Sequence, residues 1–226
     1  MGKIIRKYLA PPDDPIFKSG LRCSPIRSGP LPASRTQAGT RKVPEPERAN
    51  DVLRIARAID FAARKHAAQR RKGEAAEPYI NHLAEVALLV AEATKGADAD
   101  LVIAALLHDT IEDQGVRYEE LAEAFGAEVA DLVQEVTDDK TLPKAKRKAL
   151  QVEHAPHKSP RARMLKIADK TSNLRSILAS PPADWSVERK REYFEWAAKV
   201  VAGCRGVNRG LEAQFDEAFD KGKAIF

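Results

Sequence analysis

The chain has 226 residues, of which 31% are charged, and its formal net charge is +5. This length allows one domain, with or without an extension, and a core large enough to need no disulfide or metal staple. The longest uncharged apolar runs, residues 86–91 and 101–107, are far shorter than the stretch of about 20 residues that crosses a bilayer, which excludes a membrane-spanning protein.

The positive charge is concentrated at the N-terminus. Residues 1–50 carry 10 Lys and Arg against 4 Asp and Glu, hence +6, whereas residues 51–226 carry 28 against 29, hence −1. Residues 1–50 also hold 8 of the 14 prolines and little apolar periodicity, so we predict a disordered extension there and a folded domain over 51–226. A basic arm for an anionic partner and a dispensable solvated leader both stay open as its role. Cys23 and Cys204 are too few for a disulfide framework, which favours a reducing, cytoplasmic location.

From residue 51 onward, apolar residues recur at helical spacing, and no alternating strand pattern is found. The first helix is expected to be capped by Asp51 and to carry an amphipathic face of Val52, Ile55, Ile59 and Ala62/Ala63. Further helices are predicted from about residue 80, from 98 or 100, over 118–136 with a break near Gly126, and over 144–152, 163–178, 186–203 and from 208. Residues 101–107 are apolar on all sides and should be buried. The predicted fold class is all-α.

Four positions in this helical pattern carry side chains that commonly bind metals. His82 lies at the start of the second helix, the pair His108–Asp109 ends the buried helix, and Asp169 lies in a later helix. Taken alone, His82 is compatible with a solvated or capped histidine, and Asp169 with an ion pair to a neighbouring lysine. The pair His108–Asp109 is different, because polar groups that end an apolar helix are costly to bury unless something compensates them.

A divalent metal would provide that compensation. Two histidines and two aspartates form a mixed nitrogen and oxygen set with room for water, which suits Mn²⁺, Zn²⁺ or Fe better than Mg²⁺. A metal held there would acidify a bound water and orient it at phosphorus. If helical geometry continues to residue 113, Glu112 shares a face with His108, and Glu112 and Asp113 are placed to act as general base and as orienter.

These motifs resemble a known family. The His108–Asp109 dyad with a later lone aspartate is similar to the pattern of the HD-domain phosphohydrolases. A fuller match, to the hydrolase domain of the alarmone (ppGpp) enzymes, lies in residues 71–72, 78–82, 104–113 and 166–170. Residues 135–144 and 192–198 look closest to the small, hydrolase-only members called metazoan SpoT homologs. The resemblance spans residues 52–220, essentially the whole predicted domain.

The resemblance implies an HD-type helical bundle that works as a Mn²⁺-dependent hydrolase, converting ppGpp or pppGpp to GDP or GTP plus pyrophosphate, with no synthetase activity. It implies His82, His108, Asp109 and Asp169 as metal ligands, and Glu112 and Asp113 as the residues that activate water. It implies nucleotide binding by Arg71, Lys72, Lys144, Asn173, Arg189 and Tyr193. Those types suit the task, because cations pair with a pyrophosphate and a tyrosine offers a ring face and a hydroxyl.

Two positions depart from the family pattern. Leu83 stands where the family commonly has proline, and Thr171–Ser172 replace a leucine and an aromatic residue or histidine, so we expect different contacts near the nucleobase. One alternative function is the same chemistry on another phosphorylated nucleotide, such as 2′-dephosphorylation of NADPH; another is a non-catalytic nucleotide-binding regulator. We expect a small-molecule nucleotide as partner, and neither a membrane nor a nucleic acid. The sequence leaves the oligomeric state open.

Overall fold

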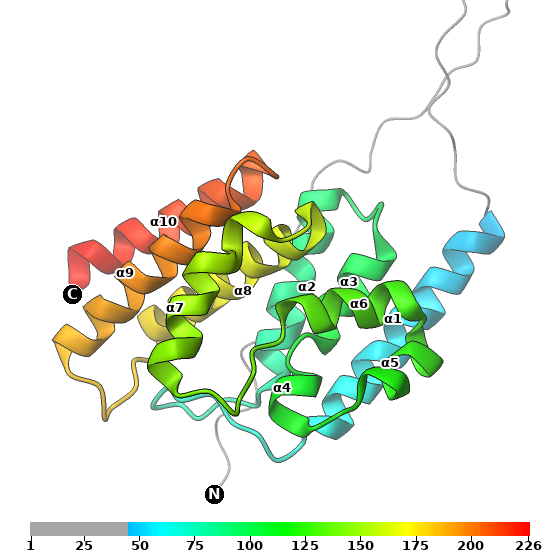
Figure 1. Cartoon of the computed structure of the whole chain (residues 1–226), viewed down its shortest axis with the longest axis horizontal. Helices are drawn as coiled ribbons and strands as arrows, with labels where there is room; N and C mark the ends of the chain where they lie inside the picture. The colour runs from blue at the N-terminus through cyan, green and yellow to red at the C-terminus, as the bar shows by residue number, and fades with distance from the viewer. Residues whose placement is uncertain (1–44) are drawn as a thin grey trace, which may run out of the picture. The chain divides into compact units, whose positions relative to one another are not determined.

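The computed structural model describes residues 45–226, with side chains from residue 50, and these residues form α-helices, one short 3₁₀ helix and no strand (Figure 1). The helices are α1 (Glu45–Lys65), α2 (Ile80–Thr94), α3 (Ala99–Leu107), α4 (Thr110–Gln114), α5 (Tyr118–Phe125), α6 (Ala127–Val136), α7 (Lys144–His154), η1 (Ala155–His157), α8 (Pro160–Ala179), α9 (Val187–Cys204) and α10 (Arg209–Ile225). The predicted all-α class is confirmed.

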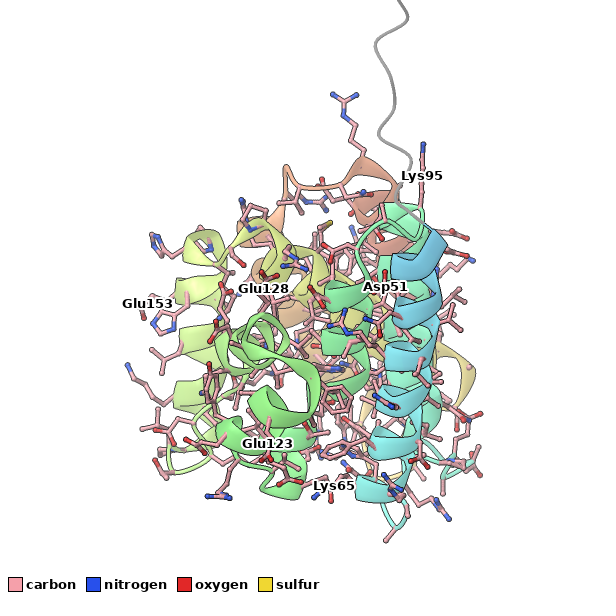
Figure 2. All side chains as sticks on the ribbon, turned by 90° about the vertical axis from the view of Figure 1, so that its right-hand side faces the viewer. Asp51, Lys65, Lys95, Glu123, Glu128 and Glu153 are labelled. Carbon is pink, nitrogen blue, oxygen red and sulfur yellow. The ribbon has the colours of Figure 1, made fainter. Side chains whose placement is uncertain are left out.

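The first helix starts earlier than predicted. It begins at Glu45, so Asp51 lies within it and is not its N-cap; Asp51 and Lys65, the last residue of α1, are labelled in Figure 2. The sequence permits this start, because Pro46 falls in the first turn, where a backbone N–H has no helical partner to lose. The predicted disordered extension over 1–50 therefore overlaps α1 at its end, and residues 1–44, with Cys23, lie outside the described part of the chain.

The face of α1 that meets the core differs in part from the prediction. Ala58 and Ala62 are fully buried and Ile55 packs against the core, whereas Val52 is 69% and Ile59 is 46% exposed. Small side chains let α1 approach α3, against which it packs. The periodicity identified the helix and placed Ile55 and Ala62 correctly, but it placed Val52 and Ile59 wrongly.

The later helix boundaries agree closely with the prediction, and their caps explain why. The side chains of Asp98, Ser159, Ser186 and Asn208 each accept a backbone N–H in the first turn of α3, α8, α9 and α10. Gly126, with φ of 96°, separates α5 from α6 at the predicted break. Such caps satisfy donors that helix geometry leaves unpaired, so they fix where a helix begins.

Helix α8 is the central element of the domain. It packs against α2, α3 and α6 on one side and against α9 and α10 on another (Figure 1). Its residues from Leu165 to Ser172 are all buried, including the charged Lys166, Asp169 and Lys170. Helix α3 is buried through Leu101–Leu107, as predicted. In the described part of the chain, no helix combines the length and apolar character that crossing a membrane requires.

Candidate metal centre and nucleotide site

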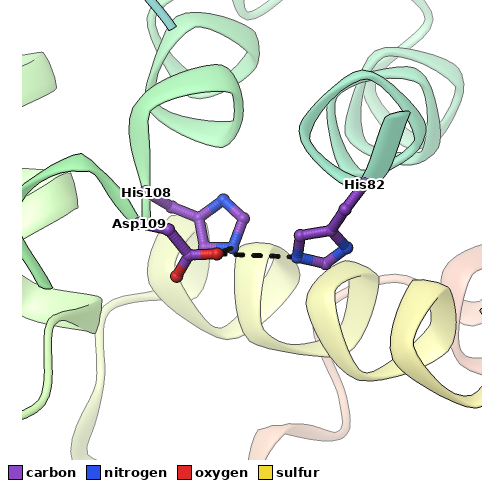
Figure 3. A group of neighbouring side chains, drawn as sticks. All are labelled: His82, His108 and Asp109. Carbon is purple, nitrogen blue, oxygen red and sulfur yellow. Dashed lines mark ion pairs between the residues drawn. The ribbon is translucent and has the colours of Figure 1, made fainter. Parts of the chain in front are cut away.

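Three helices bring the predicted metal ligands together. His82 lies in the first turn of α2, His108 follows the last residue of α3, and Asp109 precedes α4 (Figure 3). One nitrogen or oxygen atom from each of these three residues lies within 4.8 Å of the other two. His82 Nε2 is 3.7 Å and His108 Nε2 is 3.1 Å from Asp109 Oδ2. These residues form a candidate metal-binding triad.

The hydrogen bonds around the histidines leave the Nε2 atoms facing the centre of this triad. His108 Nδ1 lies 2.8 Å from the carbonyl oxygen of Ala105, and His82 Nδ1 lies 2.8 Å from the hydroxyl of Ser172. His108 Nε2 is buried and has no hydrogen-bond partner among the described residues, because its contact with Asp109 is not aligned as a hydrogen bond. A buried, unpaired ring nitrogen beside a carboxylate fits a metal ligand, since a divalent cation would satisfy both.

The charges in this centre also fit a cation. Burial acts to lower the pKa of His108, but Asp109 and then Asp169 outweigh it and raise that pKa to about 9. Burial lowers the pKa of His82, whereas the pKa of Asp109 lies well below its usual value because of the neighbouring His108 and despite burial. The two carboxylates thus favour a positive charge at this centre, and a divalent cation would supply one.

Asp169 comes to the same centre from the middle of α8. Its Oδ1 lies 3.4 Å from His82 Nε2 and 3.9 Å from His108 Nε2. The same carboxylate accepts hydrogen bonds from Asn173 Nδ2 at 2.6 Å and from Lys170 Nζ at 2.8 Å. Asp169 is therefore an ion-pair partner of Lys170 and also faces both histidines, and its role as a metal ligand stays a prediction.

Glu112 and Asp113 line the same cavity as His108 and Asp109, but they belong to a separate short helix, α4. Helix α3 ends at Leu107, and the chain turns at His108–Asp109 before α4 begins at Thr110. The condition of helical geometry through residue 113 is therefore not met without a break, because the two turn residues His108 and Asp109 separate α3 from α4. Glu112 Oε2 accepts the backbone N–H of Asp138 at 3.2 Å. Asp113 accepts a hydrogen bond from Gln69 at 2.8 Å and pairs with Lys140.

A cavity of 530 Å³ opens from this centre. Ten Lys and Arg and six Asp and Glu side chains line it, so positive charge prevails along its walls. The cations are Arg70, Arg71, Lys72, Lys140, Lys144, Arg147, Lys148, Lys166, Lys170 and Arg189. Burial, followed by the charges of Lys72 and Arg189, lowers the pKa of Lys144. Such crowded cations favour a ligand that carries several negative charges.

The basic loop between α1 and α2 is held against the end of α8. Ala75 donates its backbone N–H to the Ser180 hydroxyl at 2.8 Å, and a Cβ at Gly73 would lie 2.3 Å from the Ser180 carbonyl oxygen. Arg71 reaches from this loop to the hydroxyl of Ser176 at 3.3 Å. The close approach at Gly73 therefore places Arg71 and its neighbour Lys72 along the cavity wall.

Aromatic rings form a second wall of the cavity. Trp185, Tyr193 and Trp196 follow one another with ring centroids 5.5 and 5.3 Å apart. Arg189 lies over the ring of Trp185 at 4.5 Å, and Lys148 lies over that of Trp196 at 4.6 Å. Rings with cations beside them can contact a base or ribose and its phosphates together.

The predicted site residues lie in one region. The cavity is lined by eleven of the twelve, namely Arg71, Lys72, His108, Asp109, Glu112, Asp113, Lys144, Asp169, Asn173, Arg189 and Tyr193. His82 lies behind them, with only 1% of its side chain exposed. This placement brings the residues together, while the role of each one stays a prediction.

Comparison with known proteins agrees with this geometry. Residues 58–202 match the family model of the HD domain. The guanosine-3′,5′-bis(diphosphate) 3′-pyrophosphohydrolase MESH1 of Homo sapiens is 50% identical over 170 residues, which are 75% of this chain and 95% of that protein. MESH1 of Xenopus tropicalis is 48% identical over 177 residues, which are 78% of this chain and 99% of that protein. The chain belongs to the MESH1 family of HD-domain proteins.

The same family relationship is found among solved structures. A structure described as a metazoan ortholog of SpoT that hydrolyzes ppGpp superimposes with a TM-score of 0.72 at 42% identity, covering 74% of this chain and 94% of that one. The described residues of this MESH1 family member thus share both sequence and fold with hydrolases, which confirms the family predicted from the motifs.

The site also contains residues that the sequence analysis missed. Tyr79 donates its hydroxyl to Asp109 Oδ2 at 2.6 Å, and Gln69 holds Asp113. Tyr79 lies in the matched stretch 78–82 and Gln69 lies just before the matched pair 71–72, but only the structure shows that they contact Asp109 and Asp113. Thr171 and Ser172 are fully buried and do not line the cavity. The hydroxyl of Ser172 contacts His82 Nδ1 at 2.8 Å, and different contacts near the nucleobase stay a prediction.

Proposed function

We propose that the chain hydrolyses guanosine 3′,5′-bis(diphosphate), and its 5′-triphosphate form, at the 3′-pyrophosphate to give GDP or GTP and pyrophosphate. The observation that carries this proposal is the joining, in one cavity, of the candidate metal triad with a wall of cations and aromatic rings. A nucleotide with two separate phosphate groups matches that combination. The MESH1 proteins that the chain covers almost completely are named for this reaction.

His82, His108, Asp109 and Asp169 are the residues that would hold a divalent cation, for which we propose Mn²⁺, with Zn²⁺ or Fe as alternatives. The mixed imidazole and carboxylate set supports these metals over Mg²⁺. Such an ion, when bound, supplies Lewis-acid chemistry toward water and phosphate oxygens. The fit rests on the Nε2 atom of each histidine, because the Nδ1 atom of the same ring already has a hydrogen-bonding contact. This contact is the carbonyl oxygen of Ala105 for His108 and the hydroxyl of Ser172 for His82.

Glu112 is the proposed general base. Burial raises its pKa, and so do the charges of Asp109 and Asp138, which brings a carboxylate closer to the range in which it can take a proton from water. Its other oxygen lies 3.5 Å from Arg147, which limits its rotation. Asp113, held by Gln69 and Lys140, is proposed to orient the attacking water. The water adds to the phosphorus that carries the 3′ oxygen, and the bond from that phosphorus to the ribose oxygen breaks.

The cations are proposed to bind the phosphates of the nucleotide. Arg71 and Lys72 approach from the loop before α2, Lys144 from the start of α7, and Arg189 from α9. Tyr193 and Asn173 complete the proposed nucleotide contacts; burial raises the pKa of Tyr193 to about 12, so its hydroxyl keeps its proton and can donate to the substrate.

The test is direct. Purified protein is incubated with Mn²⁺ and ppGpp, and the products are separated by anion exchange; GDP and pyrophosphate are expected in equal amounts. A parallel reaction with NADPH separates the proposed activity from 2′-dephosphorylation. Release of inorganic phosphate from NADPH, with ppGpp left intact, would contradict the proposal. If neither substrate turns over and ppGpp still binds, the protein is a non-catalytic regulator.

Absence of synthetase activity and a cytoplasmic location stay predictions. The first is supported by the named hydrolases that match the chain over 95% and 99% of their length. Incubation with ATP and GDP tests it, and formation of ppGpp would contradict it.

A further inference from the structure

The two proposed histidine ligands differ in what their Nδ1 atoms contact: a side chain, Ser172, for His82 and a backbone carbonyl, Ala105, for His108. Figure 3 shows one nitrogen of this ring turned toward Asp109 and the other turned away from it. The nitrogen that points away, Nδ1, lies 2.8 Å from the hydroxyl oxygen of Ser172 on α8. Both side chains are buried, His82 at 3% and Ser172 at 0% exposure. Water therefore cannot easily replace this contact.

The hydrogen bond from Ser172 to Glu85 fixes the direction of this contact. The hydroxyl of Ser172 donates to Glu85 Oε2 at 2.7 Å, and a carboxylate can only accept. A serine hydroxyl has one hydrogen, so Ser172 cannot also donate to His82. Its oxygen must accept from His82 Nδ1–H, which leaves the lone pair of Nε2 directed at the candidate metal centre.

Glu85 is itself held in place. Its other oxygen lies 3.3 Å from Arg175 Nη1, and Arg175 Nη2 donates to Gln214 Oε1 at 2.9 Å. Arg175 belongs to α8 and Gln214 to α10, whereas Glu85 belongs to α2. The side chain of Glu85 is 34% exposed, so it connects the buried histidine to the surface. Residues from three helices thus form one series of hydrogen bonds that ends at His82.

From this series of hydrogen bonds we infer that Ser172 and Glu85 are positioning residues, which fix the Nδ1–H tautomer of His82 and orient its Nε2 toward a divalent metal. The inference rests on the proposed metal centre. His108 reaches the same tautomer differently, through the backbone carbonyl of Ala105, which no side-chain substitution removes.

The experiment compares Glu85→Ala and Ser172→Ala with two matched controls. Glu92→Ala removes an exposed carboxylate from the same helix, and Thr171→Val removes the buried hydroxyl next to Ser172, whose partner is the Ile167 carbonyl within α8. Mn²⁺ affinity of the full chain is measured by calorimetry. Outer-shell partners of metal-bound histidines typically contribute roughly 10- to 100-fold in affinity. We expect that loss for Ser172→Ala, a smaller loss for Glu85→Ala, and wild-type affinity for both controls.

A second measurement needs no metal. In ¹⁵N spectra of the protein without added metal, His82 Nδ1 should show the shift of a protonated ring nitrogen and Nε2 that of an unprotonated one. In Glu85→Ala, Ser172 becomes free to donate, so the two shifts should move toward each other or exchange. Glu85→Ala alters a partly exposed side chain and should fold even if Ser172→Ala does not.

The outcomes separate this inference from the metal centre itself. Equal Mn²⁺ affinity in all variants, or an unchanged His82 tautomer in Glu85→Ala, overturns the inference and leaves the metal centre intact. A wild-type protein that binds no Mn²⁺ overturns the metal centre and the inference together. Equal losses in Thr171→Val and Ser172→Ala would also overturn it, because they would reflect a general effect on α8.

Discussion

The two ends of the cavity are built differently. At the inner end, the side chains of His82 and His108 are 1% and 5% exposed, and each has a second contact that fixes its ring. At the outer end, the side chains of Lys140 and Arg189 are 47% and 45% exposed. A buried, fixed set of ligands suits chemistry that needs a defined geometry, whereas exposed cations suit a flexible, highly charged ligand.

The difference also explains how a nearly neutral domain can bind a polyanion. Residues 51–226 carry a net charge of −1, so the folded part has no general positive field. The positive charge is local to the cavity, where Lys and Arg outnumber Asp and Glu by ten to six. Variants at the inner end should therefore abolish turnover, and variants at the outer end should weaken binding while the chemistry continues.

The largest effect is expected for Asp109→Ala at the inner end. This change removes a proposed ligand and also the hydrogen-bond partner of the half-buried Tyr79 hydroxyl. We expect ppGpp hydrolysis to fall to the level found without added metal, and Mn²⁺ binding to fall below detection in calorimetry. Asp131→Asn is the matched control, because Asp131 also accepts a tyrosine hydroxyl, at 2.8 Å, but on the surface. Activity of Asp109→Ala near that of the control would contradict the proposed centre.

Glu112→Gln separates proton transfer from metal binding at the same end. Glutamine keeps the shape of the side chain and can still accept the N–H of Asp138, but it cannot take a proton from water. We expect kcat to fall by about 10²- to 10⁴-fold, with Mn²⁺ affinity and KM little changed. The measurement is steady-state kinetics beside Mn²⁺ calorimetry. A loss of Mn²⁺ affinity equal to that of Asp109→Ala would make Glu112 a ligand instead of a base.

The inner end was largely predictable from sequence because three of its residues, His82, His108 and Asp109, lie at the ends of predicted helices. His82 and Asp109 follow recognisable starts and stops, and Asp169 lies in a helix with a clear cap at Ser159. The end of the buried helix at His108–Asp109 was predicted, but the separate helix α4 that follows this turn was not, because no glycine or proline marks the turn. The apolar run simply ends there, and tertiary packing decides the direction of the chain. The predicted face of α1 was wrong at Val52 and Ile59 for a similar reason, since packing leaves them exposed and buries the alanine Ala58 instead.

The hydrogen bonds behind the ligands were out of reach of sequence reasoning. Ser172 and Glu85 are 87 residues apart, and Gln69 and Asp113 are 44 apart. Neither pair has a spacing that any helix or strand pattern would connect. Only the packing of α2 against α8, and of the loop before α2 against α4, brings them together. Residue types at helix ends are local information, whereas the partners that orient them are not.

At the outer end, Lys144→Ala should change binding more than chemistry. Lys144 begins α7 and faces Lys72 and Arg189 across the cavity. Loss of one charge-assisted contact to a phosphate should raise KM by roughly 10-fold, with kcat within about twofold because binding to substrate and transition state falls equally. Lys146→Ala, on the same helix but away from the cavity and exposed, is the control. A fall in kcat with unchanged KM would contradict the division between the two ends.

The smallest effect, a shift in the pH dependence of kcat/KM, is expected for Asp138→Asn, where the two ends meet. Burial raises the pKa of Glu112 first, and the charges of Asp109 and Asp138 raise it further. Since hydrolysis requires unprotonated Glu112, activity is lost as the pH falls through this raised pKa. Asp138→Asn removes one of those charges but keeps the backbone N–H that Glu112 accepts. The pKa of Glu112 should fall, so the acidic limb of kcat/KM should move to lower pH.

The profile is measured at saturating Mn²⁺, and Asp139→Asn is the matched control for Asp138→Asn. Asp139 is the next residue along the chain, but among the described residues its carboxylate accepts hydrogen bonds from Thr141, and its charge is not one of the leading causes of the raised pKa of Glu112. An acidic limb that moves equally in both variants would reflect the general charge of the loop. A limb that stays in place in Asp138→Asn would show that another group at the inner end controls proton transfer, and would remove Glu112 from that role.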